Sequence, residues 1–434
     1  MATKSDIPRE AYRPVPWQGW VLVRRLSQMG FLLLFLLLFL KTTYSGQGIL
    51  RWLADLFFDF DPLVLAVSLL NHSKIIWRLF LSLILVGLTL ILGRFFCGWI
   101  CPMGTTLDIS RRLLFSPRPD RGYAVRLRKV KYYLLFFILA AALFSVNLAG
   151  LFDPLSLLYR TLGIVVYPEL SYGLEETFTR LYEVGKPVTY VSEPVYEFLK
   201  NTILPVRKQI FLLPFLTMGL FLLLVALERL DRRFWCRALC PLGALYGIAA
   251  RFSWLRRRPF KLCRDCGDCQ EVCKMGSIHA EAVPAHQMAE CQLCMSCQEA
   301  CQKGRVSFKF GGKVARPGLD LGRRQVLTAA AAGVVAVPLL RLGSVARRPY
   351  EFLLRPPGVD SEAAFLSQCI RCGECFKVCP TGGLQPTGWE AGLDGLYTSR
   401  LVPRLGYCEF NCTLCSQVCP SGAIPRMPLE VKQN

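Results

Sequence analysis

Four tight groups of cysteines constrain this chain more than any other sequence feature. Sixteen of its twenty cysteines fall into four quartets, and three of the quartets share the spacing C-x2-C-x2-C-x3-C. The fourth has one extra residue in its first gap. The quartets are Cys263, Cys266, Cys269 and Cys273; Cys291, Cys294, Cys297 and Cys301; Cys369, Cys372, Cys375 and Cys379; and Cys408, Cys412, Cys415 and Cys419. Three close thiolates with a fourth nearby are the ligand pattern of cubane [4Fe–4S] clusters. The sequence therefore predicts four such clusters, in two modules.

The order of the quartets also predicts which cysteines share a cluster. In two-cluster ferredoxins the fourth cysteine of each run binds the neighbouring cluster. This crossing predicts Cys263, Cys266, Cys269 and Cys301 for cluster one, and Cys291, Cys294, Cys297 and Cys273 for cluster two. It predicts Cys369, Cys372, Cys375 and Cys419 for cluster three, and Cys408, Cys412, Cys415 and Cys379 for cluster four. A proline follows the last cysteine of both quartets in the second module, whereas Lys274 and Gln302 stand there in the first.

Disulfide bonds and structural zinc are the two other common uses of clustered cysteines. Secreted chains often carry disulfide frameworks, and paired C-x2-C knuckles often hold zinc. Neither use requires three thiolates plus a fourth at x3, repeated four times. The spacing therefore favours iron–sulfur clusters, whose function is to relay single electrons.

Long apolar runs place the chain in a membrane. Of its 434 residues, 53% are hydrophobic, and four runs are long enough to cross a bilayer. These runs cover residues 22–40, 75–93, 132–150 and 209–227, and a weaker run covers residues 325–340. The predicted fold is an α-helical membrane bundle of four spans plus a fifth, twin-arginine-type span, with two ferredoxin-like 2×[4Fe–4S] α+β modules.

The positions of arginine and lysine predict the orientation of the spans. The formal net charge is +21, but the basic residues gather in residues 9–25, 111–131 and 232–258, whereas the two intervening loops are less basic and contain acidic residues. Positive residues favour the cytoplasmic side, so the N-terminus and both later basic segments are predicted to be cytoplasmic. This pattern fits membrane topology better than nucleic-acid binding.

The membrane module contains an internal repeat. Phe60-Asp61-Pro62-Leu63 recurs at residues 152–155, and Arg94-Phe95-Phe96-Cys97 followed by Cys101-Pro102 recurs at residues 233–241. Repeated two-helix units often build a site at their interface. The remaining cysteines, Cys97, Cys101, Cys236 and Cys240, are therefore a candidate membrane site. They are compatible with a metal or cluster, with redox-active disulfides, or with packing as small apolar residues.

A pair of arginines precedes the fifth apolar run. Arg323-Arg324 before a short, mildly apolar stretch is typical of a twin-arginine export signal, although a basic flank of a membrane helix looks similar. Clusters are assembled in the cytoplasm, so a cluster domain bound for the far side must be exported folded. The predicted domains are a membrane module (1–255), a cytoplasmic ferredoxin module (256–315), an uncleaved anchor (316–346) and a periplasmic ferredoxin module (347–434).

These motifs resemble two kinds of iron–sulfur protein joined in one chain. Residues 1–315 resemble the NapH-type membrane polyferredoxins, a group that also includes NosR-like and CcoG-like proteins. Residues 320–434 resemble the NapG-type ferredoxins, which carry a twin-arginine leader. The resemblance implies electron transfer from quinol through clusters to periplasmic reductases, with Cys97, Cys101, Cys236 and Cys240 as a redox or structural site in the membrane.

Missing motifs narrow the electron donor to quinol. The sequence has no C-x-x-C-H haem motif and only three histidines, His72, His279 and His286, of which only His72 lies near a span. No nucleotide-binding glycine motif follows a strand. The predicted partners are membrane lipid, the quinone pool, a periplasmic redox protein or reductase and a possible cytoplasmic electron donor. An assembly factor that reduces a metal or thiol of a client enzyme is the alternative. His72 is a candidate proton acceptor, although an ordinary interfacial histidine fits it as well.

Overall fold

The structure is a computed structural model, and it describes most of the chain. The described residues are 19–44, 55–71, 76–115, 122–183, 185, 188–202, 204–205, 209–259, 268–279, 285–301, 306–311, 321–346 and 353–433. His72, Cys263 and Cys266 lie outside them. The chain divides into two compact units. Unit 1 comprises residues 1–33, 83–132 and 227–322, and unit 2 comprises residues 34–82, 133–226 and 323–434.

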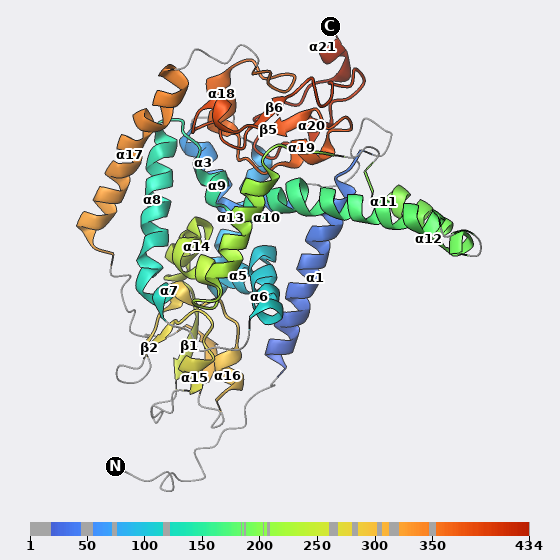
Figure 1. Ribbon diagram of the computed structural model, residues 1–434. Coiled ribbons are helices and arrows are strands. Elements are labelled where there is room, and N and C mark those ends of the chain that lie inside the picture. Colours follow the sequence, from blue (N-terminus) through green and yellow to red (C-terminus); the bar gives the residue numbers. More distant parts are fainter. Residues whose placement is uncertain are drawn as a thin grey trace, which may run out of the picture. The chain divides into compact units, whose positions relative to one another are not determined.

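Unit 1 combines the two Cys-Pro corners with the first ferredoxin module (Figure 1). Its helical elements are the first part of α1 (Trp20–Lys41), α4 (Ser82–Leu92), α5 (Phe95–Trp99), α6 (Pro102–Leu114), α7 (Tyr123–Arg126), η3 (Leu127–Lys129), η5 (Trp235–Leu239), α14 (Pro241–Ala250), α15 (Asp268–Glu271), η6 (Met288–Glu290) and α16 (Ser296–Glu299). Its strands are β1 (Leu255–Pro259), β2 (Ile278–His279), β3 (Ala285–His286) and β4 (Val306–Phe310), paired antiparallel as β1–β4 and β2–β3.

Unit 2 combines the two Phe-Asp-Pro-Leu segments with the second ferredoxin module. Its helical elements are α2 (Leu56–Asp59), α3 (Pro62–Leu70), η2 (Trp77–Leu81), most of α8 (Val130–Leu143), α9 (Ala149–Phe152), α10 (Pro154–Thr161), η4 (Leu162–Val166), α11 (Tyr167–Glu183), α12 (Val188–Thr202), α13 (Pro214–Leu227), α17 (Arg323–Ala346), α18 (Glu362–Gln368), α19 (Glu374–Val378), η7 (Trp389–Ala391), α20 (Leu414–Gln417) and α21 (Leu429–Gln433). The antiparallel strands β5 (Leu384–Pro386) and β6 (Ser399–Leu401) complete this unit.

The predicted membrane runs are helical, but the structure does not establish four full spans. Helix α1 and residues 323–340 of α17 are long and apolar enough to cross a membrane. Residues 77–92 reach this length only together with residues 95–114, and the two parts meet at an angle of 93°. The other two runs form shorter helices. Helix α8 ends at Leu143, two residues before Ser145 at a positive φ of 61°, and α13 begins only at Pro214.

Both repeated motifs begin a helix. Asp61 and Asp153 cap α3 and α10, and each is followed by a proline in the first turn. The Asp61 carboxylate accepts hydrogen bonds from the backbone of Leu63 and Val64, at 2.8 and 3.4 Å. Cys101 and Cys240 occupy the same position before α6 and α14, again followed by proline. The repeats are therefore helix starts, because a side-chain acceptor and a proline suit the first helical residues.

Two long helices lie between the second Phe-Asp-Pro-Leu segment and α13. Helices α11 and α12 pack against each other, with the rings of Phe178 and Tyr196 5.2 Å apart. In Figure 1 the pair projects sideways from the second half of α1.

Helix α17 packs along α8 (Figure 1). A Cβ atom added at Gly333 would lie 2.5 Å from the backbone oxygen of Phe137 and 3.1 Å from Ala140 Cβ. Gly333 and Val337, one helical turn apart, are both buried, whereas Ala332 is exposed. Small residues let two helix backbones approach closely, as at the interfaces of membrane helices.

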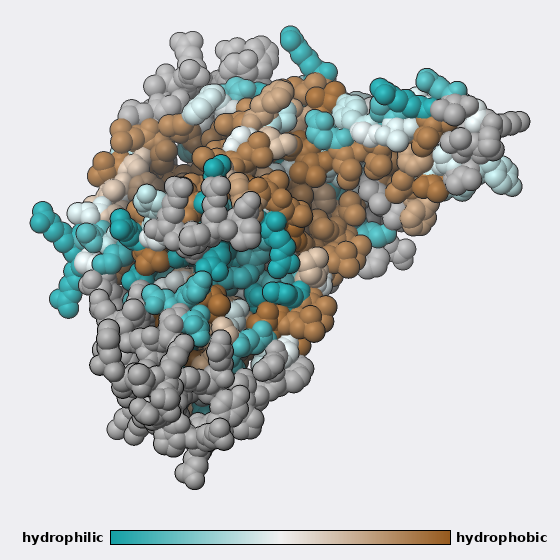
Figure 2. Space-filling model, turned by 60° about the horizontal axis from the view of Figure 1, so that its bottom comes forward, coloured by the Kyte–Doolittle hydropathy of each residue, from teal (hydrophilic) through white to brown (hydrophobic). Residues whose placement is uncertain are grey.

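Apolar side chains cover much of the surface. Leu22, Leu26, Met29, Leu33 and Leu37 form an exposed stripe at helical spacing along α1. Hydrophobic residues cover broad areas of the face shown in Figure 2. Exposed apolar patches of this size mark surfaces that meet lipid or another protein, and on helices of this length lipid is the expected neighbour.

Candidate iron–sulfur sites

A cavity in the second ferredoxin module brings together Cys369, Cys372, Cys375 and Cys419. Three of these cysteines come from the loop before α19 and from α19 itself, and Cys419 comes from the other quartet. Phe365, Tyr397 and Ile424 are among the buried residues that line the cavity. This is the set of four that the crossing rule predicts for cluster three.

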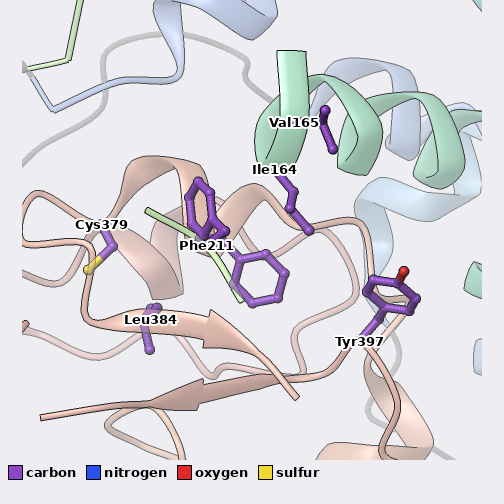
Figure 3. Packing of buried hydrophobic residues seen from close by; sticks show 7 residues of the cluster. Ile164, Val165, Phe211, Cys379, Leu384 and Tyr397 are labelled. Carbon is purple, nitrogen blue, oxygen red and sulfur yellow. The ribbon is translucent and has the colours of Figure 1, made fainter. Parts of the chain in front are cut away.

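A second cavity of the same module is lined by Cys379, Cys408, Cys412 and Cys415, the set predicted for cluster four. Cys379 lies in a hydrophobic cluster with Phe211, Leu384 and Ile164 (Figure 3). Cys408, in contrast, is exposed. The extra residue of this quartet lies in the 408–412 loop, where Lys432 donates hydrogen bonds to the backbone oxygens of Glu409 and Cys412.

A comparable cavity lies among the described residues of the first module. It is lined by Cys273, Cys291, Cys294 and Cys297, the set predicted for cluster two. For cluster one only Cys269 and Cys301 are described, because Cys263 and Cys266 lie outside the described ranges. Cys269 and Cys301 pack beside Ile278 and Val306.

The ligand loops of the two modules share a backbone conformation. Leu293 and Met295 flank Cys294 with φ of 53° and 58°, and Arg371 and Gly373 flank Cys372 with φ of 54° and 90°. Such left-handed residues turn the chain sharply, and side chains other than glycine adopt them at a cost. Their recurrence around a central cysteine indicates a loop shaped for a ligand.

One sequence signal for these sites was missed. A glycine follows the fourth cysteine of every quartet by three residues, at positions 276, 304, 382 and 422. The three described ones, Gly276, Gly382 and Gly422, have φ of 58°, 69° and 63°. Each therefore needs glycine for its backbone. The repeated C-x-x-G spacing would have predicted these turns.

Hydrogen-bond donors are directed at several of the cavity sulfurs. The backbone N–H groups of Ser277 and Ile424 donate to the sulfurs of Cys273 and Cys419, both at 3.4 Å. Thr381 Oγ1 lies 3.5 Å from the sulfur of Cys379. Burial raises the pKa of the Cys297 and Cys415 thiols to about 12, so these groups ionise only when a cation binds them. The donor set fits [4Fe–4S] clusters, whose potentials depend on hydrogen bonds to sulfur.

The four remaining cysteines lie near one another at the two Cys-Pro corners. The side chains of Cys97, Cys101 and Cys236 all lie within interaction range of Cys240. Arg94 Nη2 lies 3.9 Å from the Cys97 sulfur, and Arg233 Nη1 donates to the Cys97 carbonyl oxygen at 3.0 Å. Both arginines are fully buried. Among the described residues no group of three Cys, His, Asp or Glu side chains is arranged to hold a single metal ion, and no disulfide bond joins two of the described cysteines.

A buried carboxylate connects the first module to these corners. Glu290, directly before Cys291, accepts hydrogen bonds from Arg94 at 3.1 Å and Tyr132 at 2.8 Å, and it also pairs with Lys131. Burial alone would raise the pKa of Glu290, but Lys131 and Arg94 hold it below the usual value. Sequence reasoning missed Glu290, Arg94 and Lys131 as functional candidates because their partners are distant in the chain.

Comparisons with known proteins agree with these sites. A family described as a 4Fe-4S binding domain matches residues 75–120 and 211–261, which include both Cys-Pro corners. A family described as a 4Fe-4S dicluster domain matches residues 368–423. No solved structure matches the chain.

Three curated relatives match the chain over different lengths. The ferredoxin-type protein NapG of Escherichia coli (strain K12) is 37% identical over 113 residues, which are 24% of this chain and 47% of NapG. The ferredoxin-type protein NapH of Haemophilus influenzae is 27% identical over 262 residues, 58% of this chain and 73% of NapH. The regulatory protein NosR of Pseudomonas aeruginosa is 28% identical over 238 residues, 50% of this chain and 27% of NosR.

The cavities and the comparisons together define a class of protein. The chain is an iron–sulfur protein with [4Fe–4S] ferredoxin domains and with helices long and apolar enough to cross a membrane. More particularly, it is similar to NapH- and NosR-type polyferredoxins and to a NapG-type ferredoxin, and so confirms the predicted resemblance. It spans about half the length of the NapG protein that it matches.

Proposed function

We propose that the protein relays electrons from quinol, through four [4Fe–4S] clusters, to a redox partner in the periplasm. The observation that carries this proposal is the crossing of the quartets, since each described cavity contains three cysteines of one quartet and the fourth of another. We therefore assign the sixteen quartet cysteines as iron ligands in the predicted sets. Oxidation of one quinol releases two electrons and two protons, and each cluster accepts one electron.

The Cys-Pro corners are proposed as a further redox site on this path. Cys97, Cys101, Cys236 and Cys240 come from both halves of the repeat, and the matching 4Fe-4S family includes both corners. Arg94 and Arg233 supply positive charge beside them, which would stabilise thiolates bound to a metal or cluster. We favour such a centre over redox-active disulfides or simple packing.

The composition of each unit supports the proposed topology. The first ferredoxin module shares unit 1 with the Cys-Pro corners and their basic segments, and the second shares unit 2 with the Phe-Asp-Pro-Leu segments. By the positive-inside rule the first unit contains the cytoplasmic ends and the second contains the periplasmic ends. The packing of Gly333 on α8 supports α17 as a retained fifth span with Arg323 and Arg324 at its start.

Iron analysis and quinol oxidation test the proposal on the purified full chain. Four clusters require about sixteen iron atoms per protein, and more iron would indicate a centre at the corners. Under anaerobic conditions menaquinol should bleach the cluster absorbance at about 400 nm. Zinc in place of iron would refute the cluster assignment. Full iron content with no reduction by any quinol would favour the alternative, an assembly factor that reduces a metal or thiol of a client enzyme.

A further inference from the structure

In unit 1, one ligand loop of the first module lies directly against a Cys-Pro corner. Gly98 follows Cys97, and a Cβ atom added there would overlap the carbonyl oxygen of Gln292. Trp99 Nε1 donates to the carbonyl oxygen of Leu293 at 3.0 Å. Gln292 and Leu293 are the two residues between Cys291 and Cys294. The backbone of this loop therefore touches the corner with no side chain between them.

One arginine from each half of the internal repeat, Arg94 and Arg233, also holds this loop in place. Arg233 Nη1 donates to Gln292 Oε1 at 2.5 Å and also to the carbonyl oxygen of Cys97. Arg94 donates to Glu290 and to the carbonyl oxygen of Ala289, at 3.1 Å in both cases. Each arginine thus joins a residue beside Cys291 to the corner that contains Cys97.

In unit 2, the matching loop of the second module makes the same kind of contact. A Cβ atom added at Gly150, in α9, would overlap the carbonyl oxygen of Ile370. Ile370 follows Cys369 as Gln292 follows Cys291. Arg160 Nη1, from α10, donates to the carbonyl oxygen of Arg371 at 3.1 Å, and its guanidinium lies 4.2 Å from the centre of the Tyr397 ring. Asn71 Nδ2, at the end of α3, donates to the carbonyl oxygen of Ser367 at 2.5 Å.

The two contacts are alike in residue position and backbone shape. In each, the carbonyl oxygen of the residue after the first cysteine meets a glycine, and the next residue, Leu293 or Arg371, has a positive φ. The two cavities of the second module differ in the solvent exposure of their cysteines. Cys372, in the docked loop, is buried, whereas Cys408, in the other cavity, is exposed.

We propose that the two ferredoxin modules exchange electrons with the membrane module through the loops Cys291–Cys294 and Cys369–Cys372. Gly98 and Gly150 are the positioning residues, because the absence of a side chain at each allows the close approach of the loop. Clusters two and three are then the membrane-proximal clusters, and the exposed Cys408 edge of cluster four is the side from which an electron leaves for a soluble partner. This inference rests on the proposed function for its ligand sets. It adds the order of the clusters within the relay.

The test uses the full-length protein with Gly98→Ala and Gly150→Ala. A new methyl group must displace the facing carbonyl, because a backbone atom offers no flexible end that could move away. We expect Gly98→Ala to shift the EPR signal and midpoint potential of cluster two, and Gly150→Ala to shift those of cluster three. The signals are assigned with Cys294→Ser and Cys372→Ser, each of which should change one cluster only.

Two glycines provide matched controls. Gly87 in α4 and Gly173 in α11 have no atom within 4 Å of an added Cβ, so Gly87→Ala and Gly173→Ala should leave all signals unchanged. If Gly98→Ala does not accumulate, Gln292→Ala removes the Arg233 hydrogen bond without adding bulk and should shift the cluster-two signal in its place. Asn71→Ala serves the same purpose for cluster three.

These outcomes are independent of whether quinol is the donor. The potentials are measured by chemical titration, so a protein that quinol does not reduce still tests the order of the clusters. Shifts confined to cluster one or cluster four, or no shift in a protein with full iron content, would overturn the inference. Where quinol does reduce the protein, rapid freezing should show cluster three reduced before cluster four, and Gly150→Ala should slow the reduction of both.

Discussion

The guanidinium of Arg94 lies against Gly243, which belongs to the other half of the internal repeat. A Cβ atom at Gly243 would be 2.8 Å from Arg94 Nη2. The relationship is reciprocal, because a Cβ atom at Gly104 would be 3.2 Å from Arg233 Nη1. The arginine before one Cys-Pro corner therefore occupies the space left by the glycine of the other. The two corners are interlocked, and their four cysteines are held as one group.

Replacing Glu290 by glutamine should strongly destabilise unit 1. Glu290 is 4% exposed, and its partners Arg94 and Lys131 are fully buried. Removing one member of a buried charge network typically costs about 3–5 kcal/mol, since the remaining charges lose their compensation. The apparent melting temperature, followed by loss of cluster absorbance, should fall. Glu176→Gln is a suitable control, because Glu176 pairs with Arg180 on an exposed face and should cost no more than about 0.5 kcal/mol. Equal melting temperatures for the two variants would contradict the prediction.

The crossing of ligands gives a sharp prediction for Cys379. In sequence Cys379 belongs with Cys369, Cys372 and Cys375, but it lines the cavity of Cys408, Cys412 and Cys415. Cys379→Ser should therefore remove or alter the EPR signal of cluster four and keep that of cluster three, with a loss of at most about four iron atoms. Cys419→Ser should do the reverse. An uncrossed arrangement would exchange these two results.

The cavity cysteines of the second module could be proposed from the sequence for a physical reason. A cubane cluster needs several thiolates within a few residues, so its ligands are local and their spacing is visible. The helix starts at Asp61 and Asp153 also depend on neighbouring residues only, since each combines a capping aspartate with the proline that follows it.

The contacts that fix the modules were not predictable in this way. The partners Gly98 and Gln292 are 194 positions apart, and nothing near either residue indicates the other. Hydropathy alone also did not predict the lengths of the membrane helices, since α8 and α13 are shorter than the apolar runs that contain them. Leu213 has a positive φ of 69° and precedes Pro214, and since the residue before a proline disfavours helix, the apolar run from residue 209 begins its helix late.

The two repeated aspartates should make stability depend on pH. Asp61 and Asp153 are both buried, and burial together with the negative charge of the nearby Asp153 raises the pKa of Asp61 well above its usual value. The folded state then binds a proton that the unfolded state has lost, so stability is complete at low pH and falls as pH rises through the raised pKa.

Asp61→Asn isolates this effect. Asparagine is an equally good helix cap and can donate to Asp153 without a proton that titrates. The melting temperature of the wild-type protein should fall more steeply than that of the variant between about pH 5 and about pH 8. Parallel pH profiles would show that the pair does not share a proton. Asp360→Asn, which changes an exposed aspartate outside this pair, controls for the loss of one charge.

The paired arginines predict how the second module is exported. A reporter fused after Asn434 should be active only outside the cytoplasm, and changing Arg323 and Arg324 to lysine should retain it inside. Lysine keeps the positive charge, so a simple basic flank would tolerate the change. Export of the lysine variant at the wild-type level would therefore identify the pair as an ordinary membrane flank.

Gly333 predicts whether α17 remains in the protein as a packed membrane helix. Gly333→Leu places a large side chain against the backbone of Phe137, where even a Cβ atom is crowded. We expect this variant to separate α17 from α8, because only small residues allow two helix backbones such a close approach. Cysteines introduced at Tyr133 and Gln325, whose side chains hydrogen-bond between α8 and α17, should then be joined less efficiently by a short bifunctional thiol reagent than in the Ala332→Leu control, whose new side chain faces outward. If α17 were a leader that is removed after export, the mature protein would instead begin after it, and N-terminal sequencing of the periplasmic module would detect the new end whether or not Gly333 is changed.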